Sequence, residues 1–201
     1  MFGVVLLKII GITGGIGAGK STVLDYINCN YNAYCIVVDI IRAMTIRPGG
    51  KAYKEILDTF GIDILDKNFL IDNKKLIEVV FSSKSNLTKY NNIVNFAIKN
   101  KVLEILGVLK EYGMYDIILI ESAILFEQDI AECCDEIWYV HTDILDRKQR
   151  LLKRGDFTED IISNIISYQK MPSEFKRLCN RTIDNNGNIN SLFTEIDTII
   201  K

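Results

Sequence analysis

The chain has 201 residues, 48% of them hydrophobic, which is typical of one folded domain with a sizeable apolar core. Its formal net charge of −2 lacks the basic excess of a nucleic-acid-binding protein, and no apolar run reaches the roughly 18 residues of a membrane span. The charge and the short apolar runs predict no nucleic-acid or membrane partner. The five cysteines have neither zinc-site nor CxxC spacing, so we predict reduced thiols and a cytoplasmic location.

The first forty residues alternate between strand and helix patterns. Val4–Thr13 is a continuous apolar run, typical of a parallel strand covered on both faces, and the glycine-rich loop Gly14–Gly19 follows it. Ser21–Ile27 has helical character, and Tyr34–Asp39 is a second apolar strand that ends in a carboxylate. This alternation predicts an α/β fold.

The middle of the chain has a different pattern. From residue 40 to about 112, apolar residues recur three or four positions apart, which predicts amphipathic helices with a break at Pro48-Gly49-Gly50. The stretch is long for one crossover connection, so we interpret it as a helical insertion.

The second half of the chain returns to alternating elements. Buried strands are predicted at Asp116–Glu121 and Glu136–Val140, and a short last strand at Arg181–Asp184. Asp143–Ser167 reads as helical and charged with an interruption near Gly155, and a closing helix is predicted at Ser191–Ile200.

The loop after the first strand carries the most specific motif. Gly14–Ser21 fits GxxxxGK[ST], and a predicted strand before it and helix after it are the context that this motif requires. Glycines let backbone N–H groups surround a polyphosphate, Lys20 can reach its β- and γ-phosphates, and the Ser21 hydroxyl can bind Mg²⁺. The alternative is a glycine turn that binds nothing, but Lys20-Ser21 directly after the glycines would then have no packing role. We therefore predict an ATP and Mg²⁺ site whose phosphate-binding residues are Gly15, Gly17, Ala18, Gly19, Lys20, Ser21 and Thr22.

Asp39 is the first candidate for the reaction itself. It closes the second predicted strand, and ligands of open parallel sheets bind just outside the carboxyl ends of the strands. A carboxylate there could accept a proton from an attacking hydroxyl or orient that hydroxyl. Aspartate is also a favoured helix cap, and position alone leaves both readings open.

Arg150 and Arg154 are the second candidates. They lie four residues apart in the charged helical stretch, so they share a face and could clamp phosphate oxygens. A solvated basic face is the other reading, and the spacing does not decide between them. Arg147 lies in the same charged stretch, and Arg177 and Arg181 are further candidates with weaker grounds. Of the other polar residues, we predict Glu121 near a metal, Glu127 as a cap or in the lining of the cleft, and His141 as a structural residue.

Several segments, in this order and spacing, resemble those of the dephospho-CoA kinase family. The resemblance starts with residues 10–22 and Asp39-Ile40-Ile41, and continues with Ile124-Leu125-Phe126-Glu127. Gln149-Arg150-Leu151 with Arg154, Gln169, and then Ile183-Asp184-Asn185-Asn186-Gly187, complete it. Only the glycine loop is specific by itself, whereas the ordered set is specific as a whole.

The resemblance implies a function and an architecture. The family phosphorylates the ribose 3′-hydroxyl of dephospho-CoA with ATP and Mg²⁺, the last step of coenzyme A biosynthesis. It has a three-layer P-loop NTPase fold with a parallel five-stranded sheet, so we expect a single domain with its core at about 1–39, 113–145 and 178–201. The helical acceptor region would then be about 40–112 and the lid about 146–177. The implied catalytic residues are Asp39, Lys20, Arg150 and Arg154.

The chain departs from the family pattern in its acceptor region. Val37 stands where the family has an acid, Ala43 where it has an arginine, and Asn95-Phe96 near an expected His-Pro pair. Two alternatives stay open: another small-molecule or nucleoside monophosphate kinase, and a nucleotide-binding protein with impaired catalysis. We expect a monomer or a weak homo-oligomer.

Overall fold

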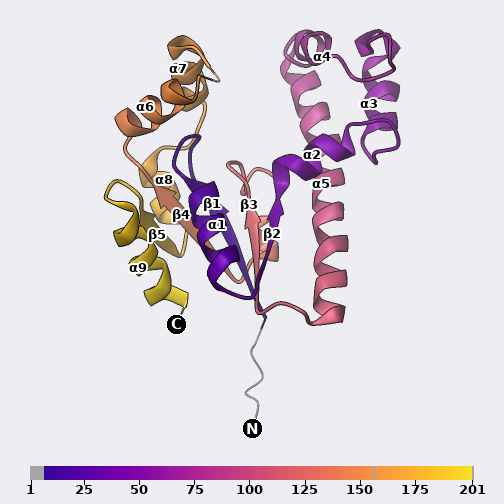
Figure 1. Ribbon diagram of the computed structural model, residues 1–201. Helices are drawn as coiled ribbons and strands as arrows, with labels where there is room; N and C mark the ends of the chain where they lie inside the picture. The colour runs from indigo at the N-terminus through magenta and orange to yellow at the C-terminus, as the bar shows by residue number, and fades with distance from the viewer. Residues whose placement is uncertain (1–6, 156, 201) are drawn as a thin grey trace. The chain divides into compact units, whose positions relative to one another are not determined.

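The computed structural model describes residues 7–155 and 157–200, which form two compact units (Figure 1). The first unit contains the chain up to Ile36 together with Tyr112–Leu125 and the residues from Ala131 onward. The second contains Val37–Glu111 and Phe126–Ile130. Residues 4–6 of the predicted first strand lie outside the described residues.

The first unit is built on a five-stranded sheet in the order β2-β3-β1-β4-β5. β1 pairs in parallel with both β3 and β4, and β4 pairs in parallel with β5. The strands are β1 (Lys8–Thr13), β2 (Ala33–Val37), β3 (Ile117–Glu121), β4 (Glu136–His141) and β5 (Arg181–Asp184). The predicted α/β fold with a parallel five-stranded sheet is confirmed, while β2 is shorter than predicted because Val38 and Asp39 are already helical.

The central strands are buried on both faces, which explains their continuous apolar sequences. Ile10 and Ile12 in β1, Leu119 in β3 and Trp138 in β4 are all at most 1% exposed. Burial of a large aliphatic side chain contributes about 1.5–3 kcal/mol, so these residues stabilise the sheet that carries the glycine loop.

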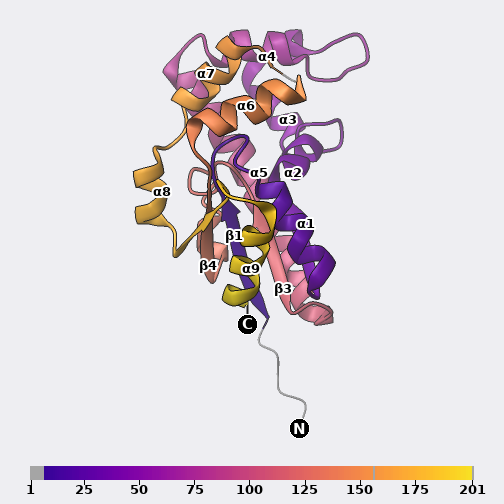
Figure 2. The ribbon, with the colours of Figure 1, turned by 60° about the vertical axis from the view of Figure 1, so that its left-hand side comes forward.

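Helices cover both faces of this sheet. Along the sheet, the chain moves in one direction from β1 to β2 and in the opposite direction from β4 to β5. Because both crossovers are right-handed, their helices lie on opposite faces of the sheet. Figure 2 shows α1 on one side of the strands and α8 on the other. The helices of this unit are α1 (Lys20–Asn30), η2 (Ala131–Cys133), α6 (Ile144–Arg154), α7 (Glu159–Ser167), α8 (Pro172–Leu178) and α9 (Ile189–Ile200).

Two aromatic stacks fix these layers. The ring of Tyr26 in α1 lies 4.0 Å from that of Phe193 in α9, and the ring of Tyr139 in β4 lies 4.7 Å from that of Phe175 in α8. The predicted three-layer arrangement is therefore present in the first unit.

The second unit is helical, as its three- and four-residue periodicity predicts. Its helices are α2 (Val38–Thr45), α3 (Tyr53–Phe60), η1 (Ile62–Ile64), α4 (Asn73–Val80) and α5 (Lys84–Tyr112), the last of which ends at the boundary of the unit. Ile56, Ile98 and Val102 are fully buried, and Arg42 Nη2 donates a hydrogen bond to Tyr90 OH at 3.0 Å. In the described part of the chain, no helix is both long and apolar enough to cross a membrane.

Glu136 joins the amino-terminal ends of three strands and makes the first unit sensitive to acid. Its carboxylate lies 3.0 Å from Lys8 Nζ and 3.2 Å from Arg181 Nε, and it accepts a hydrogen bond from Trp138 Nε1 at 2.9 Å. Burial alone would raise the pKa of Glu136, but hydrogen bonds from Trp138, Arg181 and Lys8 outweigh it and lower this pKa to about 2.

We therefore expect Glu136→Gln to lower the free energy of unfolding by about 2 kcal/mol at neutral pH, after allowance for solvent screening. A depressed carboxyl pKa stabilises the folded state above the unfolded pKa, near 4.5, and this contribution disappears as the pH falls toward 2. Urea unfolding followed by circular dichroism from pH 7 to pH 3 measures the difference between wild type and variant. Glu111→Gln, at an exposed position in α5, is the control, and an equal loss at both pH values would contradict the assignment.

Candidate functional site

The glycine loop joins the end of β1 to the start of α1 and has the backbone that an anion site needs. Gly14, Gly17 and Gly19 have φ values of 146°, 77° and 91°, which favour glycine. A Cβ on Gly19 would also collide with the side-chain amide of Asn185. Gly19 is the N-cap of α1 and supplies no side-chain cap, and the first turn of this helix contains no acid. The first N–H groups of α1 are therefore suited to bind a phosphate.

Lys20 lies at the end of this loop, beside the acid that closes β3. Its Nζ donates a hydrogen bond to Gly14 O at 3.1 Å and lies 3.4 Å from Glu121 Oε1. Both side chains are largely buried, with 11% and 13% of their surface exposed. Glu121 was predicted to lie near a metal ion, and the structure places it beside the lysine of the loop.

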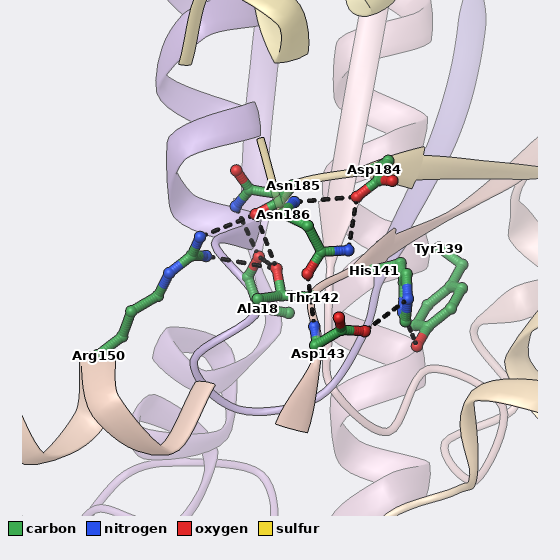
Figure 3. A network of polar contacts seen from close by, with 9 residues as sticks. All are labelled: Ala18, Tyr139, His141, Thr142, Asp143, Arg150, Asp184, Asn185 and Asn186. Carbon is green, nitrogen blue, oxygen red and sulfur yellow. Dashed lines mark hydrogen bonds and ion pairs between the residues drawn. The ribbon is translucent and has the colours of Figure 1, made fainter. Parts of the chain in front are cut away.

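Arg150 connects α6 with the two loops that follow β4 and β5 (Figure 3). Its Nη2 donates to Asn185 O at 2.8 Å, and its Nη1 donates to Thr142 Oγ1 at 3.3 Å. Thr142 Oγ1 and Asn185 Nδ2 both donate to Ala18 O, at 2.9 and 2.8 Å. These hydrogen bonds hold the glycine loop against the loops that follow β4 and β5, and they orient the Arg150 side chain beside the glycine loop.

A cavity of about 580 Å³ opens between the glycine loop, α6 and the start of α9, all within the first unit. Its cationic lining includes Arg150 and Arg154, and none of the described residues that line it is a carboxylate. Arg154 makes no hydrogen bond or ion pair with the residues that the structure describes, so its guanidinium can bind a ligand. The lining residues are Gly17, Gly19, Thr22, Arg150, Lys153, Arg154, Asn185, Gly187 and Ile189. Such a cavity suits a polyanion with a flat, less polar portion.

Asp39 belongs to the second unit and lies in the first turn of α2, with an exposed side chain. The N-cap of this helix is Val37, so the alternative that Asp39 caps the helix is wrong. Its catalytic role stays a prediction. Within the same unit, the side-chain amide of Asn95 donates to Glu127 O at 3.0 Å, so Asn95 connects α5 to the segment after β3.

The oxygen donors present fit a Mg²⁺ ion that is held mainly by phosphate. Among residues 7–155 and 157–200, no group of three or more His, Cys, Asp or Glu side chains could hold a metal by itself. The exposed Ser21 hydroxyl in the first turn of α1 and the Glu121 carboxylate are hard oxygen donors at the loop. Mg²⁺ usually takes only one or two protein ligands beside phosphates and water, and this donor set meets that requirement.

Sequence reasoning named Arg147 only as a cation of the charged stretch, and Gln169 and Asn185 only within the family-like segments, and it did not single out Thr142. Thr142 directly follows β4 and Asn185 directly follows β5, so their positions at carboxyl ends of neighbouring strands were a usable signal. His141 shares a hydrogen bond with Tyr139 OH at 3.1 Å and lies 3.4 Å from Asp143, and its structural role stays a prediction. Arg177 and Arg181 do not line the cavity.

Comparison with known proteins gives the family. The sequence profile described as dephospho-CoA kinase matches residues 8–191. The chain is 35% identical to the dephospho-CoA kinase of Fusobacterium nucleatum subsp. nucleatum, across 95% of this chain and 96% of that protein. It is 33% identical to the dephospho-CoA kinase of Carboxydothermus hydrogenoformans, across 98% and 94% of the two chains. The crystal structure of TT1252 from Thermus thermophilus shares the fold, with a TM-score of 0.78, 23% identity and 97% of each chain covered. With this match over nearly its whole length, the chain belongs to the dephospho-CoA kinase family.

Proposed function

We propose that the protein transfers the γ-phosphate of ATP to the ribose 3′-hydroxyl of dephospho-CoA and so forms CoA and ADP, the last step of coenzyme A biosynthesis. The observation that carries this proposal is the cationic cavity at the glycine loop, in a chain of the dephospho-CoA kinase family. The shape and charge of the cavity support a nucleoside triphosphate as the phosphate donor. Membership of the family supports dephospho-CoA as the acceptor.

The phosphates of ATP would bind at the glycine loop. The amides of Gly15, Gly17 and Gly19 would surround the β-phosphate together with the start of α1, which has no side-chain cap. The Ala18 amide would join them after leaving Gly15 O, to which it donates at 3.1 Å. The Lys20 ammonium would leave Gly14 O and reach the β- and γ-phosphates, and Thr22 lines the cavity where the α-phosphate would lie. Ser21 would hold Mg²⁺, which neutralises charge on the phosphate oxygens when it is bound.

The acceptor hydroxyl would be oriented by Asp39. Phosphoryl transfer has a loose transition state in most analyses, so positioning of the attacking oxygen matters more than basicity. The Asp39 side chain is exposed in the first turn of α2. It would accept the proton of the 3′-hydroxyl as the new bond to phosphorus forms.

Arg150 and Arg154 would bind phosphate oxygens of ATP and also neutralise the charge that shifts toward the leaving ADP. Arg150→Lys keeps the charge but cannot reproduce the fork that joins Asn185 O and Thr142 Oγ1. Loss of one charge-assisted hydrogen bond, about 1.5 kcal/mol, raises the KM for ATP roughly tenfold. Steady-state kinetics with varied ATP measures this change. Arg177→Lys, in α8 and outside the cavity lining, is the matched control, and an unchanged KM in Arg150→Lys would remove Arg150 from nucleotide binding.

A coupled assay of ADP release, with dephospho-CoA, AMP, CMP or shikimate as acceptor, tests the proposal directly. Turnover with dephospho-CoA alone, and product phosphorylated on the ribose 3′-oxygen, is the expected result. Preference for another acceptor would point to a different small-molecule kinase. Binding of ATP without turnover of any acceptor would point to a catalytically impaired nucleotide-binding protein.

We further propose that the enzyme acts in the cytoplasm as a monomer or weak homo-oligomer. All five cysteines are free thiols, as expected in a reducing compartment. Burial raises the pKa of Cys134 and of Cys179 to about 12, so these two thiols stay protonated and unreactive. Analytical ultracentrifugation across a concentration series measures the oligomeric state.

A further inference from the structure

Arg147 is a buried cation whose side chain bonds no carboxylate among the described residues. It lies in the first half of α6, only 5% exposed, and among the residues that the structure describes its side chain bonds two neutral oxygens. Its Nε donates to Ile16 O at 2.8 Å, and its Nη2 donates to Gln169 Oε1 at 2.5 Å. Burial lowers the pKa of Arg147, but a guanidinium stays charged throughout the accessible pH range. A buried charge without a counter-ion destabilises a fold, so its presence here requires a reason.

The residue that Arg147 holds is the apex of the glycine loop. Gln169, which follows α7, accepts the N–H of Ile16 at 3.1 Å through the same Oε1 that Arg147 bonds. Both backbone polar groups of Ile16 are therefore engaged by two side chains of the segment between β4 and β5. These three residues all belong to the first unit.

The guanidinium of Arg147 also lies close to the backbone of the loop at Gly15. A Cβ placed on Gly15 would collide with three guanidinium atoms of Arg147. Unlike Gly14, Gly17 and Gly19, Gly15 has no positive φ, so a side chain at this position would conflict with the Arg147 guanidinium and not with the backbone conformation. The positive charge is thus held in direct contact with the loop that binds the phosphates.

We propose that Arg147 and Gln169 are positioning residues of the phosphate loop, and that the uncompensated charge of Arg147 contributes to nucleotide affinity because the bound phosphates supply its missing counter-ion. This inference rests on the proposed binding of ATP at the loop. Gln169 has a neutral amide at the position where a carboxylate would neutralise Arg147, and this leaves the charge available to the ligand.

Gln169→Glu separates this role from simple packing. The variant keeps an oxygen acceptor for both Ile16 N–H and Arg147 Nη2, but it places a counter-charge on Arg147. If Arg147 and Gln169 only supported the fold, Gln169→Glu would leave the nucleotide affinity unchanged. The stronger ion pair would then leave the thermal midpoint unchanged or raise it. Under our proposal the thermal midpoint is unchanged or higher, while the affinity for the non-hydrolysable analogue AMP-PNP and for inorganic tripolyphosphate falls roughly tenfold.

Isothermal titration calorimetry with Mg²⁺ and each of these two probes measures the affinities. Asn164→Asp, which adds one negative charge at an exposed position of α7, is the matched control and should bind both probes like wild type. Arg147→Met, which removes the charge, should lose a similar factor and provides an independent test if Gln169→Glu does not fold.

Unchanged affinity in either folded variant would overturn the inference and leave the proposed function intact. Because the titration contains no acceptor, it is informative even if dephospho-CoA is not the substrate. Wild-type protein that binds neither probe would overturn both this inference and the proposed ATP site.

Discussion

Replacing Asp39 by asparagine is expected to lower kcat by about 10²–10⁴-fold, the usual contribution of a positioned proton acceptor, with little change in the KM for ATP. Asparagine has nearly the same shape, so α2 and its packing are retained. It cannot accept a proton from the 3′-hydroxyl, and its amide would orient that hydroxyl differently. Because the phosphate-binding residues belong to the other unit, nucleotide binding should not depend on this side chain. Initial rates with ATP and dephospho-CoA each varied in turn measure the two constants.

Asp58→Asn is the control for this experiment. Asp58 is an exposed acid of α3 in the same unit, so its replacement removes the same charge without affecting the proposed reaction centre. Its kcat should stay near that of wild type. If Asp39→Asn also turned over at nearly the wild-type rate, Asp39 would have no part in proton transfer or in orienting the acceptor.

The sheet could be predicted from sequence because each central strand is buried on both faces. Such strands are continuous apolar runs, and Ile117–Glu121 and Glu136–His141 were located to within one residue. The end of β2 could not be found in this way. The chain passes from Val37 into α2 without a glycine, proline or side-chain cap, so Val38 continues the apolar pattern of the strand up to Asp39.

The helix α8 was missed although the sequence contains its start signal. Pro172 is the first residue of the helix, and Glu174 accepts a hydrogen bond from the backbone N–H of Met171 at 2.9 Å. Proline at the first helical position and an acid two residues later are common at helix starts. With only seven residues, α8 is too short to show a clear apolar period.

The candidate site was predictable only where it is local in sequence. The glycine loop, Lys20 and Ser21 follow one another, and their spacing alone predicts a phosphate site. The groups that hold the loop are remote: Thr142 is 124 residues and Asn185 is 167 residues from Ala18, whose carbonyl both of them bond. Their meeting depends on the strand order, which places β1 beside β4 and β4 beside β5.

Lys20→Met is expected to have the largest effect on nucleotide use. The variant removes the one cation that the motif places against the β- and γ-phosphates, and loss of such a preorganised group typically lowers kcat by about 10²–10³-fold. The KM for ATP should rise as well, because the charge acts on bound ATP and on the transition state. Lys20→Arg should also be impaired, since a planar guanidinium does not fit the space in which Nζ lies 3.1 Å from Gly14 O and 3.4 Å from Glu121 Oε1.

The effect of Lys20 on binding has to be separated from its effect on the fold, because its ion pair with Glu121 is largely buried. Thermal unfolding of Lys20→Met measures the contribution to stability, and calorimetric titration with AMP-PNP below the unfolding midpoint measures the contribution to binding. Lys176→Met, at an exposed position of α8, removes a cation of the same unit and should bind AMP-PNP like wild type. If folded Lys20→Met kept wild-type affinity and turnover, the backbone amides and the arginines of α6 would be sufficient for the phosphates, and Lys20 would be a partner of Glu121 alone.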